Sequence, residues 1–325
     1  MKAIQISRNG GPEVLEYIER DDPVPAADEV LVRAAAIGVA KPDYLMRSGK
    51  YRWAPPLPSI IGNEMAGHVA AVGSAIADVA VGDPVLVWGY EQGCYVDVGA
   101  YRRHRIQKLP AGIAPEAAVS IPNYLVARAL LHETAARPPR TVYVDGAAGG
   151  IGTAVIQLGT QAGMTVIGGA SSAAKCAFAK KVGAAHAIDY SGENVVDRLL
   201  DLTDGRGVDL FLDSMIGPAF PDNLKALATH GTIVSFNALK GLPETETFAA
   251  MRALAAKCLG VRCFSFHGYD HDPEGTQALL DAVLPLFADG RIVPPIHARL
   301  PLAEARQAHE LLDARAIMGK LVLVP

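Results

Sequence analysis

The run TVYVDGAAGGIG, residues 141–152, constrains the fold of this chain more than any other stretch. Residues with high β propensity lead into Asp145-Gly146 and a series of small residues, and the apolar residues of 153–158 recur at helical spacing. Strand, tight glycine turn and helix begin a dinucleotide-binding βαβ unit. Small residues let the backbone approach a pyrophosphate, whose charge the N–H groups at the helix N-terminus receive. The predicted contact residues are Ala147, Ala148, Gly149, Gly150, Ile151 and Gly152.

The motif reads A-x-G-x-x-G rather than G-x-G-x-x-G, and such a turn alone could simply pack a helix on a strand. The pattern downstream favours the nucleotide-binding interpretation. Strands are predicted at 141–146, 164–168, 186–188, 207–213, 231–236 and 260–266. The clearest helices between them are Ala174–Lys181, Asn194–Leu202 and Phe248–Cys258, and Gly163 and Gly183 stand where helix C-terminal caps belong. This alternation predicts an α/β protein with a doubly wound, six-stranded parallel Rossmann sheet.

The first 120 residues follow a different pattern. Short strands such as 30–35, 67–72 and 82–87 are separated by glycines and prolines, which predicts a β-barrel-type domain. The last 60 residues mix two helices, 276–288 and 302–314, with strands at 296–300 and 320–324. This piece is short for a separate domain, so we expect it to pack on the N-terminal one.

Composition excludes several classes of function. A net charge of −4 provides no basic surface for nucleic acid. The N-terminus lacks the apolar core of a signal peptide, and no apolar run is long enough to span a membrane. The four cysteines are scattered without a CxxC pair, which indicates a reducing compartment and no zinc cage. We therefore expect a cytoplasmic protein that binds neither nucleic acid nor membrane.

The end of the second predicted strand indicates the cofactor. An NAD site normally places a carboxylate there for the ribose 2′-hydroxyl, but residues 165–172 contain none. Ser171, Ser172 and Lys175 follow instead, and hydroxyl and ammonium groups suit a 2′-phosphate. The sequence therefore favours NADPH. The two serines could also serve only as a helix cap.

With these features in hand, the sequence resembles the zinc-independent NADPH:quinone oxidoreductases of the zeta-crystallin type, within the medium-chain dehydrogenase/reductase superfamily. The likeness covers nearly the whole chain. Its motifs are Gly11-Pro12-Glu13-Val14-Leu15, Glu29–Arg33, Asp43, Arg47-Ser48-Gly49, Tyr51, Gly62–Gly67, Gly82-Asp83, Ala147–Gly152, Val208-Asp209, Asp213-Ser214, Pro301-Leu302, Ala308–Leu312 and Gly319-Lys320.

The resemblance implies a GroES-like catalytic domain, residues 1–122 and 267–325, around an NADPH-binding Rossmann domain, residues 123–266. It also implies a cleft between them and a homodimer. Lys175, Tyr190 and Arg315 match family residues that hold the 2′-phosphate. The remaining cofactor-binding positions that it implies are Ser214, Ser235, Phe236 and Asn237, the last three at the nicotinamide end.

The resemblance also allows zinc chemistry to be judged. Ala40 and Asn63 stand at the positions of the first two zinc ligands of the superfamily's alcohol dehydrogenases, and neither side chain suits zinc. A metal-independent enzyme is therefore expected. His267 and His271, with Asp270 between them, have the spacing of a ligand pair, but a solvated loop is the better interpretation because no third partner is evident.

Two positions depart from the close relatives. Ala40 replaces a pocket asparagine, and Val126 replaces a threonine that meets the nicotinamide. Both changes make the expected substrate pocket more apolar, which puts quinone recognition in question. The pocket residues that we expect are Ala40, Arg47, Asn63, Tyr124 and Val126, with Tyr44, Tyr51, Trp53, Tyr90 and Tyr124 as possible aromatic walls or as ordinary packing.

These features predict hydride transfer from NADPH to a conjugated carbonyl substrate, with quinones first. Tyr51 is the candidate donor to the developing oxygen charge, and Asp43 is expected to order the pocket rather than to carry protons. Two alternatives stay open. One is reduction of the C=C bond of an enone or alkenal, and the other is an NADPH-binding sensor or structural protein with little catalysis.

Overall fold

The computed structural model describes residues 1–89, 91, 93–243 and 246–325. The chain divides into two compact units. The terminal unit comprises Met1–Pro122 and Leu284–Pro325, and the central unit comprises Asn123–Val283. The first boundary coincides with the predicted one, whereas the second lies 17 residues beyond 266/267, inside the continuous helix α9 (Pro273–Ala288). A helix carries no turn signal at such a boundary, so the sequence pattern could not mark it.

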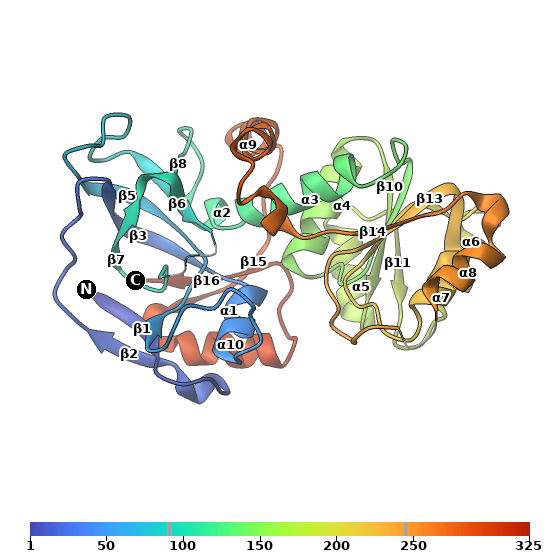
Figure 1. Cartoon of the computed structure of the whole chain (residues 1–325), viewed down its shortest axis with the longest axis horizontal. Helices are drawn as coiled ribbons and strands as arrows, with labels where there is room; N and C mark the ends of the chain where they lie inside the picture. The colour runs from blue at the N-terminus through green and yellow to red at the C-terminus, as the bar shows by residue number, and fades with distance from the viewer. Residues whose placement is uncertain (90, 92, 244–245) are drawn as a thin grey trace. The chain divides into compact units, whose positions relative to one another are not determined.

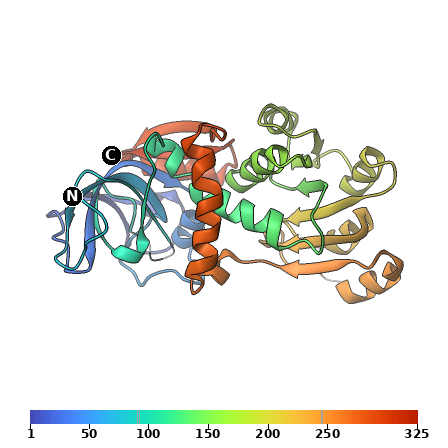
Figure 2. The ribbon, with the colours of Figure 1, turned by 90° about the horizontal axis from the view of Figure 1, so that it is seen from above.

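The central unit contains, among the described residues, the six-stranded parallel sheet that the sequence predicts. The strand order is β11-β10-β9-β12-β13-β14, which is the doubly wound order of a Rossmann fold. Figure 2 shows helices on both faces of this sheet. The strands are β9 (Thr141–Val144), β10 (Thr165–Ala170), β11 (His186–Asp189), β12 (Val208–Asp213), β13 (Leu227–Ser235) and β14 (Gly260–Cys263).

The helices of this part of the chain are mostly where the sequence places them. Gly163 and Gly183 take positive φ values of 78° and 120° directly after the C-caps of α4 and α5, as predicted. The helices are α3 (Ile121–Glu133), α4 (Gly150–Gln161), α5 (Ala173–Lys181), α6 (Val195–Leu202), α7 (Phe220–Asn223), η3 (Leu224–Ala226), α8 (Thr247–Ala253), η4 (Ala255–Lys257), η5 (Phe266–Tyr269) and α9.

The single helix predicted over Phe248–Cys258 is wrong in its second half. Helix α8 ends at Ala253, a 3-10 turn follows, and Cys258 adopts a left-handed conformation with φ of 52°. The Lys257 ammonium donates hydrogen bonds to the backbone oxygens of Lys225 and Leu227, at 2.9 and 2.7 Å. These tertiary contacts hold the turn near the start of β13. They stabilise it more than continuation of the helix would.

The terminal unit is mainly β structure, as predicted. A larger sheet has the order β15-β16-β3-β5-β6-β8, with β7 also pairing with β3, and a smaller one has the order β2-β1-β4. Strand β16 pairs antiparallel with β3, so the C-terminal segment does pack on the N-terminal domain. The strands are β1 (Lys2–Ile6), β2 (Glu16–Glu19), β3 (Glu29–Val39), β4 (Ser59–Ile60), β5 (Glu64–Val72), β6 (Pro84–Trp88), β7 (Val98–Arg102), β8 (Ile106–Lys108), β15 (Ile296–Pro301) and β16 (Lys320–Val324).

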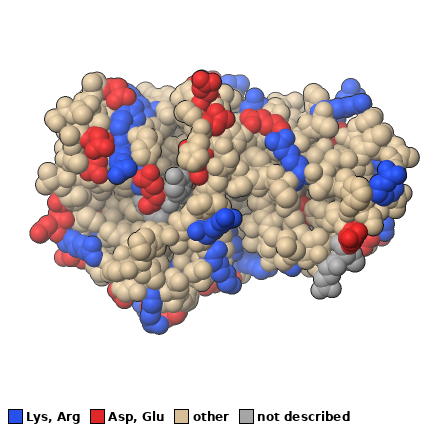
Figure 3. Space-filling view, in the orientation of Figure 1, with Lys and Arg blue, Asp and Glu red and all other residues tan. Residues whose placement is uncertain are grey.

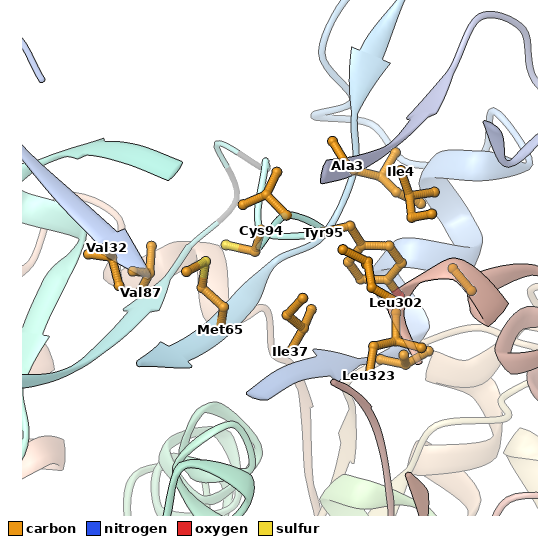
Figure 4. Close-up of a cluster of buried hydrophobic side chains, with 14 of the residues drawn as sticks. Ala3, Ile4, Val32, Ile37, Met65, Val87, Cys94, Tyr95, Leu302 and Leu323 are labelled. Carbon is orange, nitrogen blue, oxygen red and sulfur yellow. The ribbon is translucent and has the colours of Figure 1, made fainter. Parts of the chain in front are cut away.

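Short helices join these strands. Helix α1 packs against α10, and α10 also contacts η1 and β16. Figure 4 shows Tyr95 within the apolar core, close to Leu302 and Leu323. The helices are η1 (Pro12–Val14), α1 (Lys41–Arg47), η2 (Arg103–Arg105), α2 (Pro115–Ala118), η6 (Leu302–Glu304) and α10 (Ala305–Asp313).

Of the helices in the described part of the chain, none combines the length and the apolar character that crossing a membrane requires. On the face drawn in Figure 3, basic and acidic side chains are interspersed.

Candidate active site

The glycine turn lies at the carboxyl end of β9, where it leads into α4. Gly146 has a φ of 59°, and the N-cap residue Gly149 provides no side chain to bond the first helical N–H groups. Gly152 packs so tightly that a β carbon there would lie 2.7 Å from the Ala147 Cα atom and would overlap the Gly146 oxygen. The turn therefore has the small side chains and the helix N-terminus that a dinucleotide phosphate requires.

The predicted 2′-phosphate residues of the central unit meet at the end of β10. The Lys175 ammonium lies 3.3 Å from the Ser171 hydroxyl, and the Lys175 N–H lies 3.4 Å from the Ser172 hydroxyl oxygen. Ser172 is therefore the N-cap of α5, as the alternative reading allowed, while Ser171 and Lys175 bring a hydroxyl and a cation together. Tyr190 follows β11 and donates its N–H to the Ala170 oxygen at 3.0 Å. The four residues thus lie around one edge of the sheet.

The remaining central-unit candidates follow the neighbouring strands at the same edge. Ser214 comes directly after β12, and Ser235 is the last residue of β13. The Phe236 N–H donates to the Asp213 oxygen at 3.1 Å, and the Ser235 hydroxyl lies 3.5 Å from the Asn237 oxygen. Because all these strands are parallel, their carboxyl ends bring these residues to the edge that carries the glycine turn.

The carboxyl groups of Asp145 and Asp213 form a buried pair at this edge of the sheet. The sequence analysis did not identify this pair. The Met215 N–H lies 3.2 Å from an oxygen of Asp145 and 2.8 Å from an oxygen of Asp213, so one donor contacts both groups. The Ser214 N–H and hydroxyl also donate to Asp145. Burial, and next the Asp213 carboxylate beside it, raise the pKa of Asp145 well above its usual range. The two carboxyl groups therefore link the glycine turn after β9 to the loop after β12 through the N–H groups that they share.

In the terminal unit, Asp43 ties two predicted pocket residues together. Its carboxylate accepts the Ala40 N–H at 2.8 Å and the Asn63 N–H at 3.2 Å. The Tyr95 hydroxyl lies 3.2 Å from Asp43 and 3.1 Å from His309 Nε2. Asp43 is 0% exposed, and its carboxyl oxygens contact the backbone N–H groups of both Ala40 and Asn63.

Burial shifts the pKa values of Asp43 and His309 in opposite directions. It raises the pKa of Asp43 to about 7, with the Glu64 carboxylate adding to the rise. It lowers the pKa of His309 to about 3, with Arg47 adding to the fall. His309 is therefore neutral at physiological pH. Tyr95 and His309 had no role in the sequence prediction because they come from segments far from Asp43.

The other predicted site residues of the terminal unit, Tyr51, Arg47 and Arg315, lie outside the hydrogen-bond network of Asp43. Tyr51 lies in the loop after α1, edge-on to Trp53 with ring centroids 5.6 Å apart. Arg47 is buried, and its Nη2 donates to both oxygens of Asp313 at 2.8 Å. Arg315 follows α10 with a φ of 52°.

The aromatic and apolar pocket candidates differ in exposure. Tyr124 on α3 is buried and its hydroxyl donates to Gln157 of α4, which is the packing alternative considered for it. Val126 on the same helix is half-buried. Tyr44 lies under the Lys41 ammonium, and Tyr90 falls outside the described residues.

The described residues contain no group of three or more His, Cys, Asp or Glu side chains placed to hold a metal ion. His267 Nδ1 instead lies 2.7 Å from Asp270, an ordinary pairing within one loop.

Two known domain families match this chain. Residues 26–129 match the alcohol dehydrogenase GroES-like domain, and residues 150–283 match a family described as zinc-binding dehydrogenase. A GroES-like domain joined to a Rossmann domain defines a medium-chain dehydrogenase/reductase.

Full-length relatives make the assignment narrower. The quinone oxidoreductase of Pseudomonas aeruginosa is 37% identical over 100% of this chain and 99% of that protein. The Escherichia coli quinone oxidoreductase, crystallised with NADPH, is 32% identical and covers 100% of both chains with a TM-score of 0.90. A 2-haloacrylate reductase structure is 25% identical, covers 100% of this chain and 99% of that one, and has a TM-score of 0.84. The chain belongs to the quinone oxidoreductase family.

Proposed function

We propose that this protein reduces quinones with NADPH by hydride transfer, without a metal ion. The observation that carries the proposal is the full-length likeness to quinone oxidoreductases, one of them crystallised with NADPH. The products are NADP⁺ and the hydroquinone, and one proton is taken up with each hydride.

The residues at the carboxyl edge of the parallel sheet fit this cofactor. The glycine turn before α4 leaves room for a pyrophosphate, and the Ser171 and Lys175 pair suits a 2′-phosphate, which a carboxylate would repel. Tyr190 and Arg315 are the further 2′-phosphate residues of the proposal, and Ser214, Ser235, Phe236 and Asn237 hold the nicotinamide end. When bound, NADPH supplies the hydride.

The terminal unit supplies the groups that act on the substrate. Tyr51 donates a hydrogen bond or a proton to the substrate oxygen as negative charge develops there. Asp43 acts through Ala40 and Asn63, whose backbone N–H groups it holds. Ala40 and Val126 make the expected pocket more apolar, which helps to exclude water but leaves fewer polar groups to recognise a quinone than the close relatives have. Arg47 and Tyr124 support the pocket from their buried positions.

Three further features belong to the same proposal. The domain formed by both chain ends carries catalysis, the functional unit is a homodimer, and the enzyme works in the cytoplasm. Zinc independence is supported by Ala40 and Asn63, whose side chains are poor zinc ligands.

The test is to mix the purified protein with NADPH or NADH and to follow loss of the reduced nicotinamide absorbance with 1,4-benzoquinone, a naphthoquinone and a simple enone. Rapid NADPH-specific oxidation by the quinones is expected. Oxidation by the enone alone would move the assignment to C=C reduction, which the likeness to 2-haloacrylate reductase favours as second candidate. NADPH binding without turnover of any acceptor would instead indicate a sensor or structural protein.

A further inference from the structure

Two acidic side chains lie against each other at the carboxyl edge of the parallel sheet. Asp145 directly follows β9 and is 6% exposed, and Asp213 is the last residue of β12 and is 1% exposed. The Met215 N–H reaches an oxygen of each group, and the two side chains are also in hydrogen-bond contact with each other. Because an ionised carboxylate can only accept, a hydrogen bond between two carboxyl groups requires a proton on one of them.

The described residues place no counter-ion on this pair. Within them, neither Asp145 nor Asp213 forms an ion pair with a lysine, arginine or histidine. Two buried negative charges without a cation are costly, and sharing one proton removes most of that cost. The geometry of the pair therefore needs one proton between the two groups.

The titratable groups around the pair are weak acids, apart from one exposed lysine. Burial, and next the charge of Asp145, raise the pKa of Tyr143 on β9, and Tyr190 and Cys176 act on the same hydroxyl. Tyrosine and cysteine ordinarily titrate at about pH 10 and pH 8.5. The Lys240 ammonium, from the loop after β13, lies 5.9 Å from the centroid of the Tyr190 ring. The proton of the pair is thus set by the two carboxyl groups themselves.

The pair holds the loop that follows β12. Three successive N–H groups of this loop, from Ser214, Met215 and Ile216, donate to the two carboxyl groups at distances from 2.7 to 3.2 Å. Ile216 has a left-handed φ of 53°, which a β-branched residue adopts only where surrounding contacts impose it. The loop is therefore strained, and the hydrogen bonds to the carboxyl pair are what impose its shape.

This loop belongs to the edge at which we place the cofactor. Ser214 is one of the proposed cofactor residues. The N–H groups of Leu239 and Lys240, in the loop after β13, donate to the Ser214 and Met215 oxygens at 3.2 and 2.9 Å. The carboxyl pair thus also supports the loop after β13, whose first residues we assign to the nicotinamide end.

We propose that Asp145 and Asp213 are positioning residues for NADPH, and that the one proton they share keeps the loop after β12 in the shape that binds the cofactor. This inference rests on the proposed function. Loss of the proton as the pH rises leaves two adjacent negative charges, which repel each other and loosen their hold on the Met215 and Ile216 N–H groups. The added charge also disfavours an anionic cofactor at the same edge. The affinity for NADPH therefore falls in alkaline solution.

The experiment titrates the full-length protein with NADPH, followed by nicotinamide fluorescence, at several pH values from pH 7 to pH 10. The Kd of the wild type is expected to rise about tenfold or more over this range, because binding linked to one proton changes Kd by up to about tenfold per pH unit. Asp145→Asn keeps the shape of the side chain and offers Asp213 a hydrogen-bond donor that does not titrate. The Kd of this variant should change by less than about twofold between pH 7 and pH 10.

Asp209→Asn is the matched control. Asp209 lies on the same strand, β12, near its other end, and pairs with Arg206 at 2.7 Å. This variant should keep the alkaline loss of affinity that the wild type shows. Asp213→Asn, with the same flat profile expected, decides the question if Asp145→Asn does not fold. Circular dichroism at each pH verifies that folded protein is titrated.

The outcomes separate this inference from the proposed function. A Kd that rises with pH in the wild type and in Asp209→Asn, but stays flat in the variants of the pair, supports the shared proton. If the wild type binds NADPH with the same pH profile as those variants, the inference is overturned and the proposed function stands. A wild type that binds no NADPH at any pH refutes both.

Discussion

Tyr51 is the residue on which the proposed chemistry depends most. Replacing it with Phe removes the hydroxyl and keeps the ring that contacts Trp53. We expect Tyr51→Phe to lower kcat with 1,4-benzoquinone about tenfold or more, because a lost hydrogen bond to developing charge is costly in the transition state. The measurement is the steady-state rate at saturating NADPH.

The control for this prediction is Tyr17→Phe, since Tyr17 is an exposed residue of β2. It should leave kcat unchanged. A loss of less than about threefold in Tyr51→Phe would rule out the role of Tyr51 as donor.

Asp43 is expected to make stability depend on pH near neutrality. Its folded-state pKa of about 7 lies above its ordinary value of 3.8, so the folded protein binds this proton more tightly than the unfolded chain does. The resulting stabilisation is fully present below about pH 4 and is lost as the pH rises to about 7. The free energy of unfolding of the wild type, minus that of Asp43→Asn, should therefore fall between pH 5 and pH 7 by roughly 1 kcal/mol per pH unit.

Urea unfolding at pH 5, 6, 7 and 8, run on both proteins, measures that difference. His309 has a lowered pKa of about 3 and so titrates with the opposite sign, but it is present in both proteins. A difference that stays constant from pH 5 to pH 8 would mean that Asp43 titrates elsewhere.

At the scale of elements, the turn between β9 and α4 tests whether close packing shapes the nucleotide site. In Gly152→Ala the added β carbon would meet backbone at Gly146 and Ala147, which cannot move aside as a side chain can. We expect a loss of about 1–3 kcal/mol in stability from this overpacking and a weaker Kd for NADPH. Thermal unfolding and fluorescence titration measure the two effects.

Gly192→Ala is the matched control. Nothing lies within 4 Å of a β carbon at Gly192, and its φ is not in the left-handed region. That variant should match the wild type in both measurements. Equal behaviour of the two variants would argue against tight packing at the turn.

Local pattern predicted most of these elements because strand propensity, helical spacing and glycine caps act within a few residues. The parallel strands from β9 to β14 and the caps at Gly163 and Gly183 are of this kind. Two buried polar clusters, by contrast, depend on residues that are far apart in the sequence. Asp145 and Asp213 are 68 residues apart and meet only because β9 and β12 are neighbours in the sheet. The network of Asp43, Tyr95 and His309 likewise joins three distant segments, so no local pattern could have indicated it.

At the scale of the molecule, each unit holds a different part of the proposed site. The central unit gathers the residues that we propose for cofactor binding at one edge of its parallel sheet. The terminal unit joins both chain ends through the pairing of β16 with β3, and it carries Tyr51 and Asp43.

The initial rate of NADPH oxidation by 1,4-benzoquinone, compared with that of NADH under the same conditions, tests both the assigned reaction and the assigned cofactor. We expect rapid oxidation of NADPH and a kcat/KM for NADPH at least about tenfold above that for NADH, because the basic and hydroxyl groups after β10 favour a 2′-phosphate. Equal use of both nucleotides would contradict the assignment of the cofactor. No oxidation of either by any quinone would contradict the assigned reaction.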